Sequence, residues 1–364
     1  MRPFDLLMPA RRVQVTADPL AAPRGQWALF MGALLALALI VLLSAAIGSV
    51  YIPPATSLRI VLAQLPFLRI AADWPETFTA ILLQIRLPRV ALVGLTGAAL
   101  ACSGTAYQGL FRNPLADPFL IGVASGAGLG AIAAIALQSA IPGLGLWLVP
   151  GGAFIGALLT VTLVYGLGHA GRSTPVTSLL LAGVAVGALA TAGSTFLLLR
   201  MGNQAARVLA FLMGGYGSAG WGAVLAVAPF TLLGFGLLYL YARPLNLLLF
   251  DADQARQLGV DVERVTLIVI VAATLTTAAA VAFSGLIGFV GLIVPHTTRL
   301  LVGADHRRLL PLATLGGAGF LLLTDLLART VIAPEELPLG VITALVGAPF
   351  FLWLLRRARR SVAL

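Results

Sequence analysis

Long apolar runs separated by short polar breaks are the dominant pattern of this chain. A helix that spans a bilayer needs roughly 20 consecutive apolar residues. Ten runs reach or approach that length, at residues 27–48, 90–111, 118–138, 146–168, 176–199, 221–242, 265–283, 284–302, 309–331 and 339–355. The stretch 265–302 is too long for one crossing, so we expect a tight turn near Ser284 and Gly285. The pattern predicts an all-α polytopic membrane protein with about ten transmembrane helices.

The composition agrees with this prediction. Of 364 residues, 60% are hydrophobic and only 10% are charged, whereas a soluble domain usually carries about 25% charged residues. A water-soluble enzyme is therefore excluded. The net charge of +10 lies between the apolar runs and not on a basic patch interleaved with aromatic residues, which argues against nucleic acid as a partner. Cys102 is the single cysteine, so disulfides and CxxC sites are excluded.

The arginines predict the orientation in the membrane. All 23 basic residues are arginine, and seven fall on one face of the expected bundle: Arg59, Arg69, Arg86, Arg89, Arg200, Arg207 and Arg329. The other sixteen fall on the face that carries both termini, which the positive-inside rule makes cytoplasmic. The first apolar run is longer than the core of a secretion signal, so we expect it to be retained as a span. We expect a cytoplasmic tail at 1–25, a membrane domain at 26–357 and a second cytoplasmic tail at 358–364.

Two connections on the cytoplasmic face have features of their own. Residues 247–264 form the most acidic stretch, and we expect two short amphipathic helices hinged at Gly259, with Asp251 or Asp253 as the N-cap of the first. Such a helix pair suits docking of a soluble protein, although a plain solvated connector fits the same residues. Residues 113–118 contain an Asn-Pro dipeptide and a second proline, which indicate a rigid turn. That turn either gates a pore or simply joins two helices.

On the opposite face, the long segment 50–89 ends with Arg86 and Arg89 at the entry of the second span. Arginines three residues apart at the start of a helix share a face and can present two guanidinium groups to a partner's carboxylates. Anchoring at the membrane interface explains the same spacing equally well.

Several motifs, in order along the chain, carry a resemblance to a known family. They are RLPR (86–89), GAALACSG (97–104), QGLFRNPLADPFLIG (108–122), LAG (181–183), MGG (213–215) with Trp221, ARQLGV (255–260), FVGLIVPH (289–296), DHR (305–307) and ELPLGVITALVGAP (336–349). With these motifs the chain resembles the permease subunit of bacterial binding-protein-dependent ABC importers, in the family that serves iron-siderophores, heme and cobalamin.

The resemblance implies a fold, partners and a location. It implies a type II ABC importer permease fold, ten helices per subunit and a homodimer with the translocation path along its axis. The partners it implies are two cytoplasmic ATPase subunits, a periplasmic substrate-binding protein and the lipid bilayer of the bacterial inner membrane. ATP and Mg would be bound by the ATPase, so this chain is expected to hold no cofactor and no metal and to be a transport subunit, not an enzyme.

The resemblance also implies roles for individual residues. The loop at 243–264 is expected to hold the ATPase-coupling helices, with Asp251, Asp253, Ala255, Arg256, Leu258, Gly259 and Val260 as the coupling residues. Arg86, Arg89 and Arg329 are expected to dock the binding protein. Asn113 and Leu115 match a cytoplasmic gate, with a second constriction at Val176 and Thr177.

Energy coupling and substrate can be addressed from the residues themselves. The chain has no lysine and hence no phosphate-binding P-loop, so the energy must come from a partner. Arg200 and Arg207 flank the external end of the fifth span. As cations at the rim of an apolar cavity, they suit an anionic iron chelate. We favour heme over a ferric siderophore as this chelate, with cobalamin as the alternative substrate. Snorkelling to the membrane surface is an equal explanation.

A proton-coupled secondary transporter is the alternative mechanism. Asp325 is the one carboxylate well inside a predicted span, and an acid in the membrane is by default a candidate for function. We expect Asp325 to be isolated, without a partner, which disfavours a proton relay.

Overall fold

The structure, a computed structural model, describes residues 23–48, 50–68, 70–141, 145, 147–169, 175–217, 219–250 and 252–362. Within these residues every regular element is a helix. The prediction of an all-α protein is therefore confirmed.

Ten helices overlap the ten expected spans. They are α1 (Pro23–Ala46), α4 (Leu87–Leu110), α5 (Val123–Ala140), α6 (Leu148–Gly168), α7 (Val176–Leu199), α9 (Trp221–Leu240), α12 (Val262–Ser284), α13 (Val290–Val302), α14 (His306–Thr330) and α15 (Leu339–Val362). Shorter helices join them: α2 (Pro54–Leu62), α3 (Glu76–Ala80), the π-helix η1 (Ile81–Arg86), the 3₁₀ turns η2 (Pro118–Ile121) and η3 (Gly202–Gln204), α8 (Ala205–Met213), α10 (Ala242–Leu248) and α11 (Ala252–Gln257).

Length separates these helices into two groups. Among the described residues, seven helical segments are long and apolar enough to cross a membrane, and three apolar segments are shorter, at Val123–Gln138, Val290–Val302 and Leu339–Leu354. The chain thus has the helices of a multi-pass membrane protein. The first turn of α4 is continuous with η1 and α3, so that one helical segment runs over 35 residues from Glu76 to Leu110.

The expected eighth span, 284–302, is only partly correct. The break falls where we predicted it, because α12 ends at Ser284 and Gly285 adopts φ 69°. Helix α13, however, starts only at Val290, after Phe289 in the left-handed region with φ 69°. Its 13 residues give a length of about 20 Å, against a hydrocarbon core of about 30 Å. The chain between α12 and α13 is therefore irregular where the sequence predicted helix.

Helix α4 lies at the centre of the bundle and packs against α9, α12, α13 and α14. Small residues permit this close packing. A Cβ atom added at Gly97 would lie 2.2 Å from the carbonyl oxygen of Gly317 on α14, and one added at Gly104 would lie 2.2 Å from that of Gly291 on α13. Contact between helix backbones is the usual means of association in a membrane, where burial of apolar surface gives little driving force.

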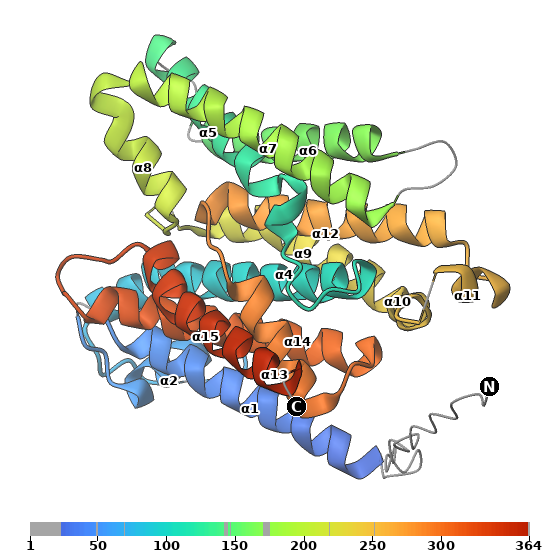
Figure 1. Cartoon of the computed structure of the whole chain (residues 1–364). Coiled ribbons are helices and arrows are strands. Elements are labelled where there is room, and N and C mark those ends of the chain that lie inside the picture. Colours follow the sequence, from blue (N-terminus) through green and yellow to red (C-terminus); the bar gives the residue numbers. More distant parts are fainter. Residues whose placement is uncertain are drawn as a thin grey trace, which may run out of the picture.

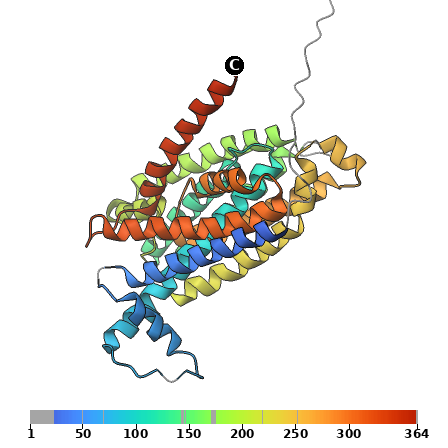
Figure 2. The same cartoon turned by 90° about the horizontal axis from the view of Figure 1, so that it is seen from below.

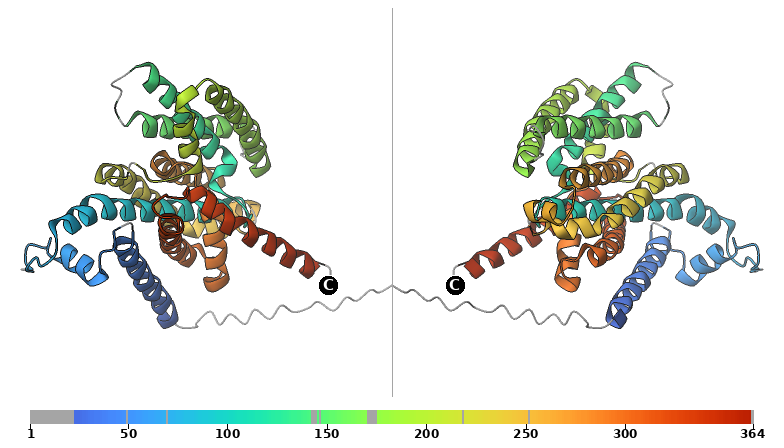
Figure 3. Two further views of the ribbon diagram at one scale, coloured as in Figure 1. Left: turned by 90° about the vertical axis from the view of Figure 1, so that its left-hand side faces the viewer. Right: turned by 90° about the vertical axis from the view of Figure 1, so that its right-hand side faces the viewer.

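The short helices gather at the two ends of the bundle. Figure 1 shows α8 and α2 at one end, which we name the α8 end, and α10 and α11 at the other, which we name the α11 end. In Figure 2 the segment with α2 projects from the bundle at the α8 end, and the C-terminal half of α15 diverges from the other helices. Figure 3 shows α5, α6 and α7 grouped on one side of the central helices.

Candidate functional site

The α11 end carries the segment predicted to be a docking element. Helix α11 ends in a Schellman motif: the N–H of Val260 donates to the carbonyl of Ala255 (3.0 Å) and the N–H of Gly259 donates to that of Arg256 (2.9 Å). Gly259 supplies the left-handed residue that this motif requires, with φ 82°. The prediction that Gly259 ends the helix is confirmed. The second short helix that we expected after Gly259 is instead the first turn of α12, which Asp261 caps by accepting from the N–H of Arg264.

Arg256 fastens α11 to α12 across this turn. Its guanidinium donates to Asp253 Oδ1 (2.8 Å) on α11 and to Glu263 Oε1 (2.7 Å) on α12. The hydrogen bond to Glu263 is the main reason why the pKa of Arg256 lies above its ordinary value. Ala255, within α11, is fully buried. Asp251 lies outside the described residues, so the structure assigns no cap to it.

Two large apolar side chains protrude beside α11. Phe250 is 74% exposed and Leu258 is 67% exposed. They flank a short helix whose C-terminal end is held by the Schellman motif and by Arg256. A rigid helix with apolar side chains exposed beside it is suited to insertion into a cleft of a partner protein.

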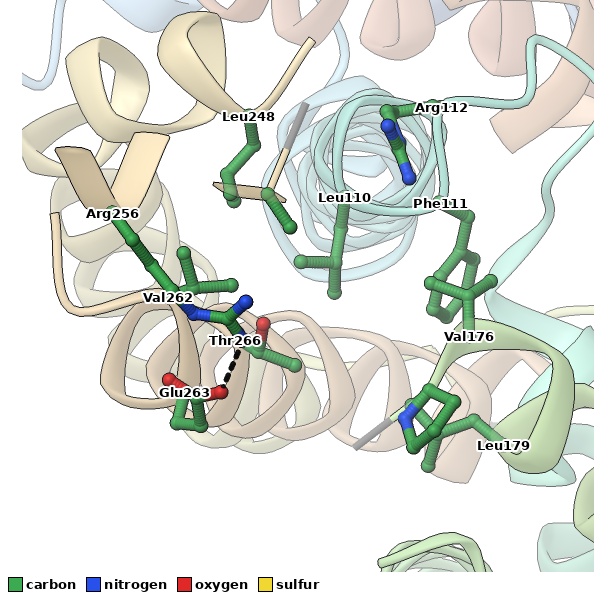
Figure 4. Close-up of a pocket in the computed structure, with 12 residues that line it drawn as sticks. Leu110, Phe111, Arg112, Val176, Leu179, Leu248, Arg256, Val262, Glu263 and Thr266 are labelled. Atoms are coloured by element: carbon green, nitrogen blue, oxygen red, sulfur yellow. Dashed lines mark hydrogen bonds and ion pairs between the residues drawn. The ribbon is translucent and has the colours of Figure 1, made fainter. Parts of the chain in front are cut away.

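A cavity separates α11 from the end of α4. It has a volume of about 280 Å³ and is lined by Leu110, Phe111, Arg112, Pro175, Val176, Leu179, Leu248, Ala252, Arg256, Val262, Glu263 and Thr266. Figure 4 shows Val176 and Phe111 on one side of it and the ion pair of Arg256 with Glu263 on the other. Movement of α11 towards α4 would therefore reduce an existing space.

The predicted gate turn follows α4 and is rigid. The N–H of Leu115 donates to Asn113 Oδ1 (2.9 Å), and the N–H of Phe119 donates to Asp117 Oδ1 (2.8 Å). The structure does not gather the four predicted gate residues in one cavity. Val176 lines the cavity beside α11 and Thr177 is exposed. Leu115 lines a different, smaller pocket together with Phe289 and Phe350.

At the α8 end, two of the three predicted docking arginines are engaged inside the fold. Arg86 is only 6% exposed and donates to the carbonyls of Ala45 (2.9 Å), Ala46 (2.8 Å) and Val50. Arg329 donates to the carbonyls of Ser44 and Ile47, both at 3.2 Å. The last carbonyls of a helix lack partners within it, so these two arginines cap the C-terminus of α1. This differs from the exposed guanidinium groups that we expected.

Arg89 and Arg329 share the carboxylate of Asp325. Arg89 lies 2.9 Å from Asp325 Oδ1 and Arg329 lies 2.9 Å from Oδ2, and the Asp325 side chain is fully buried. The expectation of an isolated acid is therefore wrong. The sequence signal was available, because Asp325 and Arg329 are four residues apart on one helix. The acid is thus held between two cations, Arg89 and Arg329.

Glu336 completes this network at the surface. Arg89 donates to both of its carboxylate oxygens at 2.8 Å, and the Glu336 side chain is 49% exposed whereas that of Arg89 is 14% exposed. Glu336 belongs to the connection between α14 and α15. Of the three predicted docking arginines, Arg89 is thus the one with an exposed carboxylate partner, Glu336, which another carboxylate could replace.

The irregular segment between α12 and α13 forms part of an apolar hollow that the sequence did not indicate. The hollow has a volume of about 500 Å³ and is lined by Leu212, Met213, Leu286, Gly288, Phe289, Gly340, Val341, Ala344 and Leu345. Backbone hydrogen bonds hold its wall: Leu286 donates to Phe211 (3.2 Å) and Leu339 donates to Gly214 (3.1 Å). Irregular backbone in a membrane protein is tolerated where it is buried or lines a cavity.

The two predicted path arginines lie near α8. Arg207 is exposed on α8, the helix whose last residues line the hollow. Arg200 follows α7 and lies over the ring of Phe196, 5.4 Å from its centroid. Among the described residues, no group of three or more His, Cys, Asp or Glu side chains is placed to hold a metal ion.

Comparison with known proteins agrees with these features. The profile of the FecCD transport family matches residues 28–357. The ABC transporter permease protein YvrB of Bacillus subtilis, itself uncharacterized, is 43% identical over 328 residues, which are 89% of this chain and 92% of that protein. The cobalamin import permease BtuC of Halobacterium salinarum is 47% identical over 78% of this chain and 75% of its own length.

Two further comparisons point the same way. The hemin transport permease HmuU of Yersinia pestis is 46% identical over 77% of this chain and 84% of its own length. A solved structure of an inward-facing metal-chelate type ABC transporter superposes with a TM-score of 0.78 at 32% identity, covering 91% of this chain and 99% of that chain.

Proposed function

The chain belongs to the FecCD transport family and has the type II ABC importer permease fold, and from that premise we propose that it carries an iron chelate from a periplasmic binding protein to the cytoplasm. It is a permease of the metal-chelate class and a multi-pass membrane protein. The observation that carries the proposal is the pairing of an apolar hollow near one end of the bundle with a rigid docking helix at the other.

We propose that the ATPase subunits bind at α11. Phe250 and Leu258 supply apolar contacts, and the Schellman motif with the bonds of Arg256 keeps α11 rigid enough to pass on a displacement. This places the α11 end in the cytoplasm of a bacterial cell, with both termini on that side. The ATPase binds ATP and Mg, and hydrolysis there moves the bundle between two packed arrangements.

At the α8 end we propose docking of the binding protein through Arg89. A carboxylate of that protein would replace Glu336 on the guanidinium, because Glu336 is exposed and Asp325 is buried. Arg86 and Arg329 support this site by holding α1 against α4 and α14.

For the substrate we favour heme. The hollow is apolar and suits the face of a porphyrin, and Arg200 and Arg207 lie on elements near it and suit propionates. Cobalamin is the second candidate, because a cobalamin permease is as similar to this chain as a hemin permease is. We propose a homodimer as the working unit.

Reconstitution distinguishes these substrates. The chain is placed in liposomes with its ATPase and binding protein, the latter loaded in turn with heme, a ferric siderophore and cobalamin. We expect ATP-dependent uptake of heme, and a reduced heme uptake in Arg200→Ala and Arg207→Ala. Uptake of cobalamin alone would overturn the assignment of heme and keep that of the importer.

A further inference from the structure

A polar cluster at the α11 end plays no part in the function proposed above. It joins Asn246 on α10 to Asp305 and His306 at the start of α14. Asn246 Nδ2 donates to Asp305 Oδ1 (2.6 Å), and Asn246 Oδ1 lies 2.8 Å from both the backbone nitrogen and the ring Nδ1 of His306. Because an amide oxygen only accepts, the ring Nδ1 of His306 donates to Asn246 Oδ1.

The opposite edge of the His306 ring contacts α4. His306 is 1% exposed, and its ring also interacts with the backbone of Thr105 on α4. A Cβ atom added at Gly109 would lie only 2.3 Å from Nε2. The imidazole therefore fills the space between α10 and the last turn of α4, in direct contact with both.

The end of α4 leads in turn to the predicted gate and to α13. The N–H of Asn113 donates to the carbonyl of Gln108 (3.1 Å). The side chain of Gln108 donates to the carbonyl of Gly291 (3.1 Å) and accepts from Arg299 Nη2 (2.8 Å). Gln108 is 2% exposed. Closely packed protein interiors have low compressibility. A displacement of α4 at Gly109 would therefore also move the gate turn and α13.

Capping of α14 does not account for Asn246. Asp305 is the N-cap of α14, where its Oδ1 accepts from the N–H of Arg307 (3.0 Å). The contacts of Asn246 are additional to that cap, and they tie α14 to α10, the helix that directly precedes α11. The cluster thus links the docking element to the bundle by side chains, independently of the peptide chain.

We propose that Asn246 and His306 are positioning residues that form a joint between the docking loop and the gate turn 113–118. Displacement of α11 by the ATPase moves α10, Asn246 moves with it, and the His306 ring passes the movement to Gly109 and so to the gate. This inference rests on the proposed function, in which the ATPase binds at α11.

The test separates assembly from transmission. The single cysteine, Cys102, is buried and is replaced in Cys102→Ala. A reporter is then introduced by Leu120→Cys, at a position just beyond the gate turn that is 39% exposed. The full chain is reconstituted in nanodiscs with its ATPase subunits. ATPase binding, ATP hydrolysis and the effect of ATP on the labelling rate of the reporter are measured.

We expect Asn246→Ala and His306→Ala to bind the ATPase normally and to hydrolyse ATP within twofold of the parent. The effect of ATP on labelling should fall at least fivefold in both. Arg308→Ala is the matched control, because it removes a second contact to Asp305, at 4.0 Å and exposed; it should behave like the parent. Gly109→Ala forces the ring away and should cause the same loss, with no additional loss when combined with His306→Ala.

Two results would contradict the proposal that Asn246 and His306 transmit movement to the gate turn. The first is an unchanged effect of ATP on labelling in Asn246→Ala and His306→Ala. The second is weakened ATPase binding in both, which would make the cluster a support of the docking loop and not a transmitter. Failure of the parent chain itself to bind the ATPase would instead refute docking at α11, and so the proposed function.

Discussion

At the scale of single residues, the charged side chains at the α8 end hold neighbouring helices together. Arg86 and Arg329 satisfy carbonyls at the end of α1, where a positive charge also complements the helix dipole. Asp325 compensates two guanidinium groups that a membrane environment would otherwise make costly. The same residue types that suit docking thus assemble three helices.

The Asp325 network predicts a large loss of stability. In Asp325→Asn, Arg89 and Arg329 lose a buried carboxylate, and removing one partner of a buried ion pair costs about 3–5 kcal/mol. Asp73→Asn is the control, because its pair with Arg59 is exposed and such pairs are worth about 0–1 kcal/mol. Thermal unfolding of the purified chain in detergent compares them. Equal midpoints for the two variants would contradict a structural role for Asp325.

If a carboxylate of the binding protein replaces Glu336 on Arg89, neutralising Glu336 should tighten the docking of that protein. Glu336→Gln no longer competes as an anion for Arg89, so the binding protein should bind more tightly, most clearly at low salt. Glu335→Gln is the neighbouring control and should leave the affinity unchanged. The dissociation constant is measured on nanodiscs at low and high salt. An affinity that is unaltered in Glu336→Gln at low salt would rule out exchange on Arg89.

At the scale of elements, the docking helix depends on its terminal glycine. A Cβ atom at Gly259 meets no atom within 4 Å, so Gly259→Ala introduces backbone strain alone. A left-handed conformation costs an alanine about 1–2 kcal/mol. We expect weaker ATPase binding and slower transport, with normal insertion in the membrane.

Gly236→Ala is the matched control for this variant, because Gly236 lies within helix α9 and its added Cβ is equally free of contacts. Both variants are assayed by co-purification with the ATPase. Docking at α11 would be contradicted by Gly259→Ala retaining the affinity of Gly236→Ala.

The sequence predicted the elements better than their internal breaks. The apolar runs located ten helices, seven of them long enough to cross a membrane, and Gly259 and Gly285 were correctly identified as helix ends. Hydropathy could not predict that residues 286–289 leave the helix, since Phe289 and its neighbours are as apolar as those of α13. Their conformation depends on a long-range hydrogen bond from the N–H of Leu286 to the carbonyl of Phe211 on α8, which no local pattern encodes.

The site was predictable to a similar degree. Local signals located the turn at 113–118 and the short helix α11, because proline, glycine and capping residues act within a few positions. The hollow and the cluster of Asn246 with His306 bring together residues from distant parts of the chain. The burial of Arg86 was not predictable for the same reason, because its partners lie about 40 residues earlier.

At the scale of the whole molecule, the two ends are joined by a core with little freedom. Helix α4 runs from Arg89 at the α8 end to Gly109 at the α11 end and touches α13 and α14 backbone to backbone. Such a core shifts between discrete arrangements and does not deform continuously. Docking at one end and ATP hydrolysis at the other would thus act on the same helices.

Uptake into sealed liposomes tests this account most directly. The chain is reconstituted either alone or with its ATPase and loaded binding protein, and accumulation of heme is followed with and without ATP. The account predicts accumulation against a gradient only with all the subunits and ATP present. Accumulation by the chain alone, driven by a proton gradient, would contradict it.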